Sequence, residues 1–228
     1  MALPVAPMAL PAADDDNGGH FTMQCIVDTH VRGKALSVVY TNDPVSVESS
    51  IQTMEQFLAK DKYQVVDFDL EYTMGRVRHD QKVAVTQLCM RHDVLVYHYH
   101  LAKTPCEHFS RFINSSDYSF AAVDTTNDLK ALKVSWLKCP NLVNIQSHYK
   151  VWGSDKNKLN SLVDLASAII DPYYIKMKNE SNKDKNVWHS VWHKRLDEQH
   201  VKYAVMDAYT SYEMYRWIVD MRKCLLPD

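Results

Sequence analysis

The stretch Val65-Val66-Asp67-Phe68-Asp69-Leu70-Glu71-Tyr72-Thr73 places three acids in a segment whose apolar residues are typical of a buried strand. A strand sends alternate side chains to opposite faces, so Asp67, Asp69 and Glu71 are expected on one face, roughly 7 Å apart from one to the next. Because such carboxylates repel one another and are costly to bury unpaired, this face requires a cation. Carboxylate oxygens favour hard divalent ions such as Mg²⁺ or Mn²⁺ over zinc.

The composition is that of a globular protein, with 228 residues, 46% hydrophobic and 24% charged. It predicts one domain over residues 20–228, after a disordered tail at residues 1–19 that ends in an acidic, glycine-containing segment. The net charge of -2 provides no overall basic field. Binding of nucleic acid would therefore rely on a local basic patch or on metal ions.

The sequence shows no targeting signal and no membrane segment. The first lysine or arginine is Arg32, which argues against a secretory or transit peptide. No apolar run approaches the roughly 20 residues that span a bilayer. The chain has five cysteines and no C-x-x-C pair. We expect these cysteines to be reduced thiols that are mostly buried. These features predict an intracellular protein, cytoplasmic and/or nuclear, without membrane contact.

The hydrophobic pattern predicts strands in the first part of the chain and helices alternating with strands in the second. The expected strands are 21–27 and 35–40 as a hairpin, then 65–73, 83–90 and 94–100 as a meander, and later 118–123 and the edge strand 143–145. The expected helices are 44–60, 105–113, one with a capped start at Thr125-Thr126-Asn127-Asp128, 159–170 and the long last helix 197–225, with an exposed loop at 176–185. This order predicts an α/β fold, a mixed sheet flanked by helices.

Two further acids are candidates for the same site. Asp207 and Tyr203, at i and i+4 in the last helix, lie on a line otherwise made of apolar and aromatic residues, where an unpartnered charge is costly. A metal shared with Asp69 and Glu71 would neutralise Asp207, and a nearby lysine would do the same. Asp128 lies in the first turn of a helix, where the helix dipole alone stabilises a carboxylate.

Three segments in order resemble the motifs of the DEDDy 3'-5' exonucleases of the DnaQ-like, ribonuclease H-like superfamily. They are Phe68-Asp69-Leu70-Glu71 in a strand, Asn127-Asp128 at a helix start, and Tyr203-Ala204-Val205-Met206-Asp207-Ala208-Tyr209 in the last helix. The chain looks most similar to Werner-type exonuclease domains, including small stand-alone members in plants. The resemblance covers roughly residues 60 to 220 and implies a ribonuclease H-like fold with a mixed sheet.

The resemblance also implies a mechanism. Residues matching Asp69, Glu71, Asp128 and Asp207 would hold two divalent ions, Mg²⁺ or Mn²⁺, with Asp69 as the bridge. The tyrosine matching Tyr203 would orient or help deprotonate the attacking water. The implied function is metal-dependent 3'-5' trimming of single-stranded or 3'-overhanging nucleic acid, RNA or DNA, with little base specificity.

Several features depart from this pattern or add to it. Asp67 stands where relatives more often have a small residue, and Asp124 adds an acid before Asp128; for both, a structural role with a lysine partner is favoured over metal tuning. The candidate backbone-binding cations, which are equally typical of plain solvated surface, are Arg76, Arg78, Lys82, Lys130, Lys183 and Lys185.

Other constellations and functions remain as alternatives. A zinc pair at His189 and His193 lacks a third ligand, and the group His98, His100, Cys106 and His108 is expected to serve packing. Tyr209, Tyr212 and Tyr215 are expected in the core. The alternative function is a catalytically silent nucleic-acid or protein interaction module on the same fold. A third hypothesis is a homo-oligomer, or a complex with a partner, that supplies the missing basic surface.

Overall fold

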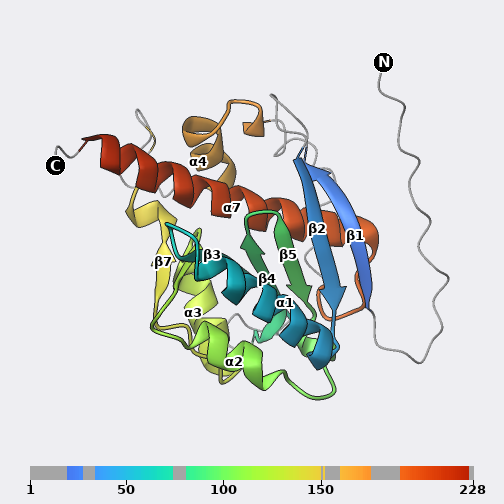
Figure 1. Cartoon of the computed structure of the whole chain (residues 1–228). Coiled ribbons are helices and arrows are strands. Elements are labelled where there is room, and N and C mark those ends of the chain that lie inside the picture. The colour runs from blue at the N-terminus through green and yellow to red at the C-terminus, as the bar shows by residue number, and fades with distance from the viewer. Residues whose placement is uncertain are drawn as a thin grey trace.

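The computed structural model describes residues 20–27, 34–73, 81–149, 151, 160–175 and 191–225. The strands are β1 Phe21–Val27, β2 Lys34–Thr41, β3 Val65–Tyr72, β4 Val83–Met90, β5 Asp93–Tyr97, β6 Ser119–Ala122 and β7 Leu142–Asn144. The helices are α1 Pro44–Leu58, α2 Glu107–Ile113, α3 Thr125–Val134, α4 Leu162–Ile169 and α7 Glu198–Leu225, with short 3-10 turns η2 Tyr99–Leu101 and η3 Ile145–Ser147. Figure 1 shows α7 running along the sheet with α4 beside it.

The seven strands form one mixed sheet in the order β1-β2-β5-β4-β3-β6-β7. The hairpin β1–β2 and the meander β3–β4–β5 are antiparallel, as predicted. The pairs β2–β5, β3–β6 and β6–β7 are parallel, and β7 is the expected edge strand. The predicted mixed α/β architecture is therefore confirmed, and the acidic strand β3 lies inside the sheet between β4 and β6.

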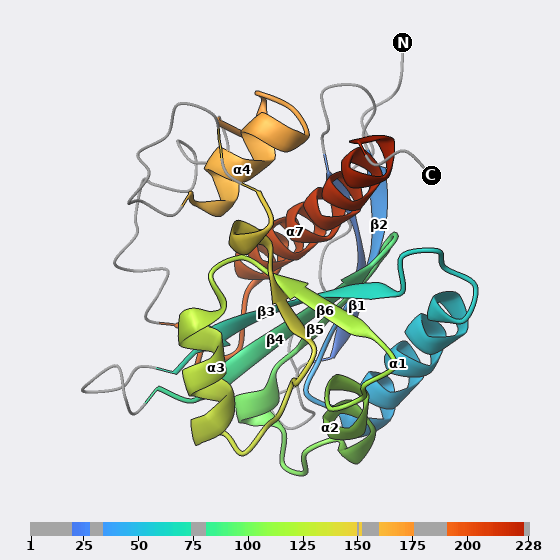
Figure 2. The ribbon, with the colours of Figure 1, turned by 90° about the vertical axis from the view of Figure 1, so that its left-hand side faces the viewer.

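Helices cover both faces of the sheet (Figure 2). On one face α1 begins at its N-cap Asp43, whose carboxylate accepts the Ser46 N–H at 2.9 Å, and it buries one apolar stripe against the sheet. The stripe comprises Val47, Ile51, Met54 and Leu58, on the helix that the sequence predicted. On the other face α7 packs against β3, β4 and β5. The alternate residues of β3 that include Asp69 thus lie on the side covered by α7.

Strand β5 is shorter than predicted. It ends at Tyr97, and the turn η2 takes up the next residues, so His98 and His100 do not continue the face of Val94 and Val96. Instead, His98 is fully buried and its Nδ1 lies 2.7 Å from the Tyr40 hydroxyl. This hydrogen bond to Tyr40 of β2 gives the buried His98 ring nitrogen a partner, as buried polar atoms require.

The same hydroxyl fixes the beginning of α7. The backbone N–H of Leu196, two residues before the helix, donates to the Tyr40 hydroxyl at 3.0 Å. Trp192 is also buried in this segment and packs its ring against that of Tyr203, at 6.2 Å between centroids. These contacts set where the first turns of α7 lie over the sheet.

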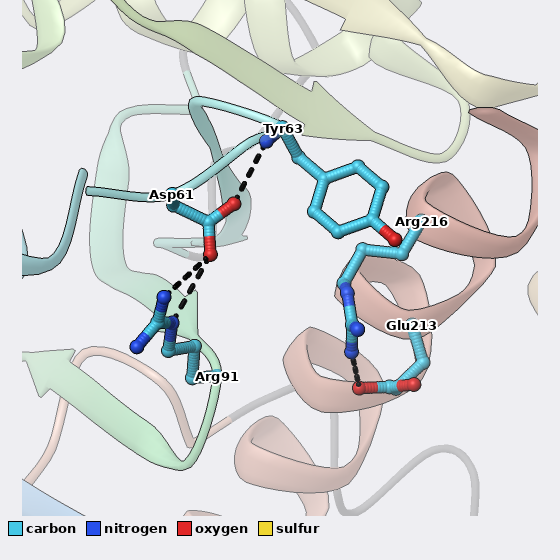
Figure 3. Close-up of polar contacts among 5 residues, drawn as sticks. All are labelled: Asp61, Tyr63, Arg91, Glu213 and Arg216. Atoms are coloured by element: carbon cyan, nitrogen blue, oxygen red, sulfur yellow. Dashed lines mark hydrogen bonds and ion pairs between the residues drawn. The ribbon is translucent and has the colours of Figure 1, made fainter. Parts of the chain in front are cut away.

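A polar cluster holds the segment that precedes strand β3 against α7 (Figure 3). Asp61 accepts the Tyr63 N–H at 2.8 Å and the Arg91 guanidinium at 3.0 Å. Arg216 of α7 lies over the Tyr63 ring at 5.0 Å and donates to Glu213 at 2.8 Å. Glu213 and Arg216 are both half-buried, and the contact of Arg216 with Tyr63 joins α7 to the segment before β3.

Several predictions concern residues outside the described ranges. These are the tail 1–19, the loop 176–185, the cations Arg76, Arg78, Lys183 and Lys185, and the zinc candidate His189. Of the cysteines with described surroundings, Cys89, Cys106 and Cys139 are buried, as predicted, and Cys224 is exposed. Among the helices that the structure describes, none has both the length and the apolarity to cross a bilayer.

Candidate active site

Strand β3 presents its three acids on one face, as alternation predicted. Asp67 pairs with Cys89 of β4, Asp69 with Gln87 and Glu71 with Val85, so the acids follow every second position of the ladder. Asp67 is fully buried, whereas Asp69 and Glu71 keep part of their surface in solvent. The two solvent-accessible acids are the ones that matched the exonuclease motif.

Helix α7 brings Asp207 and Tyr203 to this face. Both are half-buried, one helical turn apart, and the Tyr203 hydroxyl bonds to the Asp207 carboxylate. Burial raises the pKa of Asp207 to about 7, and the charge of Asp69 contributes. The charge of Asp207, and then burial, raise the pKa of Tyr203, with further contributions from Glu71 and Asp69. These mutual effects place the motif residues of α7 beside those of β3.

Helix α3 contributes Asp128, which is almost completely buried. Its Oδ1 accepts a hydrogen bond from the Tyr72 hydroxyl at the end of β3. Burial, and then the charge of Asp69, raise the pKa of Asp128 to about 8. The predicted side-chain cap at the start of α3 is not formed, because Asp124 occupies the N-cap position with a left-handed backbone and makes no capping bond.

Sequence reasoning missed Tyr72, because strict alternation turns it away from Glu71. The ladder shifts between these two residues: Glu71 pairs with Val85 but Tyr72 pairs with Val83, leaving Ala84 unpaired. Such a bulge re-aims the next side chain, which here turns Tyr72 toward Asp128. A polar aromatic residue directly after the D-x-E motif was the available signal, but the bulge has no marker in the sequence.

The carboxylates of this site destabilise one another's charged forms. Burial raises the pKa of Asp69 to about 6, although the Leu70 N–H, which donates to Asp69 at 2.9 Å, opposes this. Burial and the charges of Asp69, Asp207 and Asp128 raise the pKa of Glu71 well above its usual value. These effects connect four carboxyl groups, which we call the carboxylate cluster: Asp69, Glu71, Asp128 and Asp207.

The chemistry of the carboxylate cluster suits a hard divalent cation. All its donors are carboxylate oxygens, and Asp128 Oδ2 is buried without a hydrogen-bond partner. In the described part of the chain, however, no three His, Cys, Asp or Glu side chains are arranged as a ready ligand set. Binding would therefore require these side chains to turn toward a shared ion, which would remove the repulsion among them.

Asp67 has a different environment from the rest of its strand. Burial, and then the charge of Asp69, raise its pKa well above the usual range, and α7 covers it. Ser211 of α7 lies nearby and lowers the pKa to a lesser extent, but neither side chain makes a hydrogen bond of normal geometry. The predicted lysine partner is wrong, since no described lysine pairs with Asp67.

The other candidate constellations separate in the structure. His108 pairs with Glu55 at 3.2 Å, His98 bonds to Tyr40, and Cys106 is buried, in agreement with a role in packing. His100 is exposed, so the expectation of packing is wrong for this residue. Burial lowers the pKa of His98 to about 4. Tyr209 and Tyr212 are core residues, as predicted, and Tyr215 is half-buried. Asp124 is exposed and makes no ion pair with a described lysine, contrary to expectation.

The sequence of residues 44–221 matches the family model of the 3'-5' exonuclease domain. The match contains every residue of the carboxylate cluster as well as Tyr203. The chain belongs to this 3'-5' exonuclease family. A comparison with curated proteins returns no match.

Solved structures share the fold at low sequence identity. The EXO domain of Aedes aegypti Nibbler is 16% identical with a TM-score of 0.53, and the match covers 76% of this chain and 86% of that domain. Escherichia coli RNase D, an exoribonuclease involved in structured RNA processing, is 13% identical with a TM-score of 0.57, covering 78% of this chain and 44% of that one. Trypanosoma brucei RNase D in complex with GMP is 13% identical with a TM-score of 0.63, covering 80% and 57%.

These likenesses confirm the DnaQ-like, ribonuclease H-like fold. The chain spans about half the length of both RNase D proteins, so their activities describe those proteins and not this one.

Proposed function

We propose that the protein is a metal-dependent 3'-5' exonuclease of the DEDDy type that hydrolyses phosphodiester bonds in single-stranded or 3'-overhanging nucleic acid. The observation that carries the proposal is the carboxylate cluster, in which strand β3, helix α3 and helix α7 bring four acids and a tyrosine together in the order of the family motifs. A cluster that burial and mutual repulsion disfavour is expected to be retained for a cation.

Each residue has a role in this proposal. Asp69, Glu71, Asp128 and Asp207 would hold two ions, Mg²⁺ or Mn²⁺, which supply an activated water and neutralise charge on the phosphate. Tyr72 would hold the Asp128 carboxylate in place through its hydrogen bond. Tyr203 is bonded to Asp207 and would orient the water that attacks the phosphorus. The resemblance to Werner-type domains belongs to the same proposal.

A nucleic-acid substrate is supported by the family and by the likeness to RNA-processing nucleases. One of the structures with this fold is Trypanosoma brucei RNase D in complex with RNA U12, at 15% identity. Recognition of phosphate by metal ions would make trimming tolerant of sequence. Such a substrate would place the protein in the cytoplasm or nucleus.

The test is incubation of the purified protein with 5'-labelled single-stranded RNA and DNA, with Mg²⁺, with Mn²⁺ and with chelator. The proposal expects a ladder of 5'-labelled products that shortens from the 3' end and requires the metal. A matched substrate with a blocked 3' end should be resistant. Absence of shortening in both nucleic acids with either metal would refute the enzymatic function.

A catalytically silent nucleic-acid module is a second candidate, favoured by the absence of a ready ligand set among the described residues. It predicts that the protein binds a single-stranded oligonucleotide and leaves its length unchanged with either metal. The same incubation, followed by a binding measurement, separates the two functions.

A further inference from the structure

Helix α3 carries an exposed surface that the carboxylate cluster does not use. Trp136, just after the helix, is 94% exposed, and Leu129 on the helix is 51% exposed. Exposed lysines surround them. We call this the α3 surface, and it comprises Lys82, Leu129, Lys130, Lys133, Trp136 and Lys138.

Trp136 occupies a position that the fold would fill better with glycine. The Leu137 N–H bonds to the Leu132 carbonyl at 2.9 Å and the Trp136 N–H to that of Lys133 at 3.3 Å, which is the Schellman ending of a helix. The residue at this position is left-handed, and Trp136 has φ 60°. A bulky residue there is disfavoured, and its ring is almost wholly in solvent, so burial does not account for the tryptophan.

The charges of the α3 surface favour an anionic partner. All four lysines are exposed, and none forms an ion pair with another residue of the described ranges. Asp128 is the single acid among residues 125–145, and its side chain is buried on the opposite side of the helix. In a chain of net charge -2, this is a local basic patch of the kind that nucleic-acid binding requires.

The α3 surface adjoins the carboxylate cluster. The Ser135 hydroxyl accepts the Val83 N–H at 2.9 Å, and Val83 pairs with Tyr72, whose hydroxyl bonds to Asp128. Trp136 directly follows Ser135. The helical rise puts Ser135 about 10 Å along the axis from Asp128. Figure 2 shows α3 beside the ends of β3 and β4.

We propose that the α3 surface binds the single-stranded nucleic acid upstream of the 3' end that the carboxylate cluster holds. This inference rests on the proposed function, because it extends the same substrate-binding site. Trp136 stacks on a base, and the lysines contact successive phosphates. Stacking on an aromatic side chain is independent of base identity, which agrees with sequence-tolerant trimming.

The test variant is Trp136→Gly, because glycine suits the left-handed backbone and removes the ring without disrupting the fold. Affinity for a fluorescein-labelled single-stranded oligonucleotide is measured by fluorescence anisotropy in chelator, so that hydrolysis does not intervene. Loss of one stacking contact should weaken binding about 5- to 150-fold. The thermal midpoint should stay the same or rise. The matched control is Trp217→Ala, which removes a half-exposed tryptophan ten residues beyond Asp207 on α7.

A second pair of variants tests the charges. Lys133→Ala should weaken binding. It should also make the negative slope of log affinity against log salt less steep by about 0.7, the value for one phosphate contact on a single strand. Lys60→Ala, an exposed lysine near the start of β3 at the other end of the strand, should leave both quantities unchanged.

The outcomes separate this inference from the proposed function. If Trp136→Gly binds as tightly as the wild type, the inference is overturned, whether or not the wild type trims 3' ends. Loss of binding in Trp136→Gly supports the inference, even if the wild type shortens no substrate and the exonuclease function fails. A third outcome is that light scattering shows a dimer for the wild type and a monomer for Trp136→Gly, while affinity for the oligonucleotide is unchanged. In that case the α3 surface joins two copies of the chain, and the inference is overturned.

Discussion

At the scale of single residues, burial and mutual repulsion destabilise the charged forms of the carboxyl groups in the carboxylate cluster. The pKa is raised to about 6 for Asp69, about 7 for Asp207 and about 8 for Asp128, mainly by burial. The folded protein therefore holds these protons more tightly than the unfolded chain, whose aspartates titrate near 3.8. Stability from this source is complete below that value and is lost as the pH rises through the raised values.

This sign gives a prediction for the metal-free protein. In chelator, the thermal midpoint should fall as the pH rises from about 5 to about 8, and added Mg²⁺ should restore it at the higher pH. Asp207→Asn should increase the free energy of unfolding by on the order of 2 kcal/mol at about pH 8 and change it little near pH 4. The control is Asp117→Asn at an exposed position. A midpoint that does not depend on pH in chelator would contradict this account.

The Tyr72 hydroxyl gives a second prediction at this scale. Tyr72→Phe removes the hydrogen bond to Asp128 but keeps the ring, so nuclease activity should fall about 10- to 100-fold, the usual effect of losing a group that orients a metal ligand. Calorimetric titration with Mn²⁺ should show that Tyr72→Phe binds the ion more weakly than the wild type does. Tyr118→Phe, at a half-buried position beside Phe112, should change neither. Unchanged Mn²⁺ affinity in Tyr72→Phe would remove this role.

At the scale of elements, residue types and periodicity were sufficient to predict β3, α1 and the long last helix α7. The face shared by Asp67, Asp69 and Glu71 was predictable because alternation in a strand is a local property. The bulge beside Glu71, the early end of β5 and the burial of Arg216 were not, because each depends on a partner distant in sequence. Asp67 could be placed on its face, but its complete burial under α7 required the structure.

The contact between Tyr40 and the start of α7 can be tested. Tyr40→Phe leaves the Leu196 N–H and His98 Nδ1 without their partner and should cost about 1–3 kcal/mol in free energy of unfolding, measured with urea. It should also lower nuclease activity, because α7 carries Tyr203 and Asp207.

The matched control is Tyr97→Phe. The Tyr97 hydroxyl accepts the Cys106 N–H at 3.2 Å in the opposite layer, under α2. A comparable loss of stability with full activity is expected. Equal loss of activity in both variants would show that stability, and not the position of α7, limits the rate.

At the scale of the whole molecule, the family match covers all three acidic motifs, and the observed mixed sheet is the one that their order along the chain led us to expect. The predicted site is spread over β3, α3 and α7, and its assembly follows from the topology, because β6 lies beside β3 and leads into α3. The position of the basic surface could not be predicted, since the segments of Lys82 and Trp136 come together only where the Val83 N–H bonds to the Ser135 hydroxyl.

In the proposed function, the carboxylate cluster holds the metal ions of a 3'-5' exonuclease. The most direct measurement is the initial rate of 3' shortening of a 5'-labelled single-stranded oligonucleotide at saturating Mg²⁺, for the wild type, Asp69→Asn and Asp207→Asn in parallel. We expect metal-dependent shortening by the wild type and a loss of at least about two orders of magnitude in each variant, with folding retained. Wild-type rates in either variant would contradict this expectation.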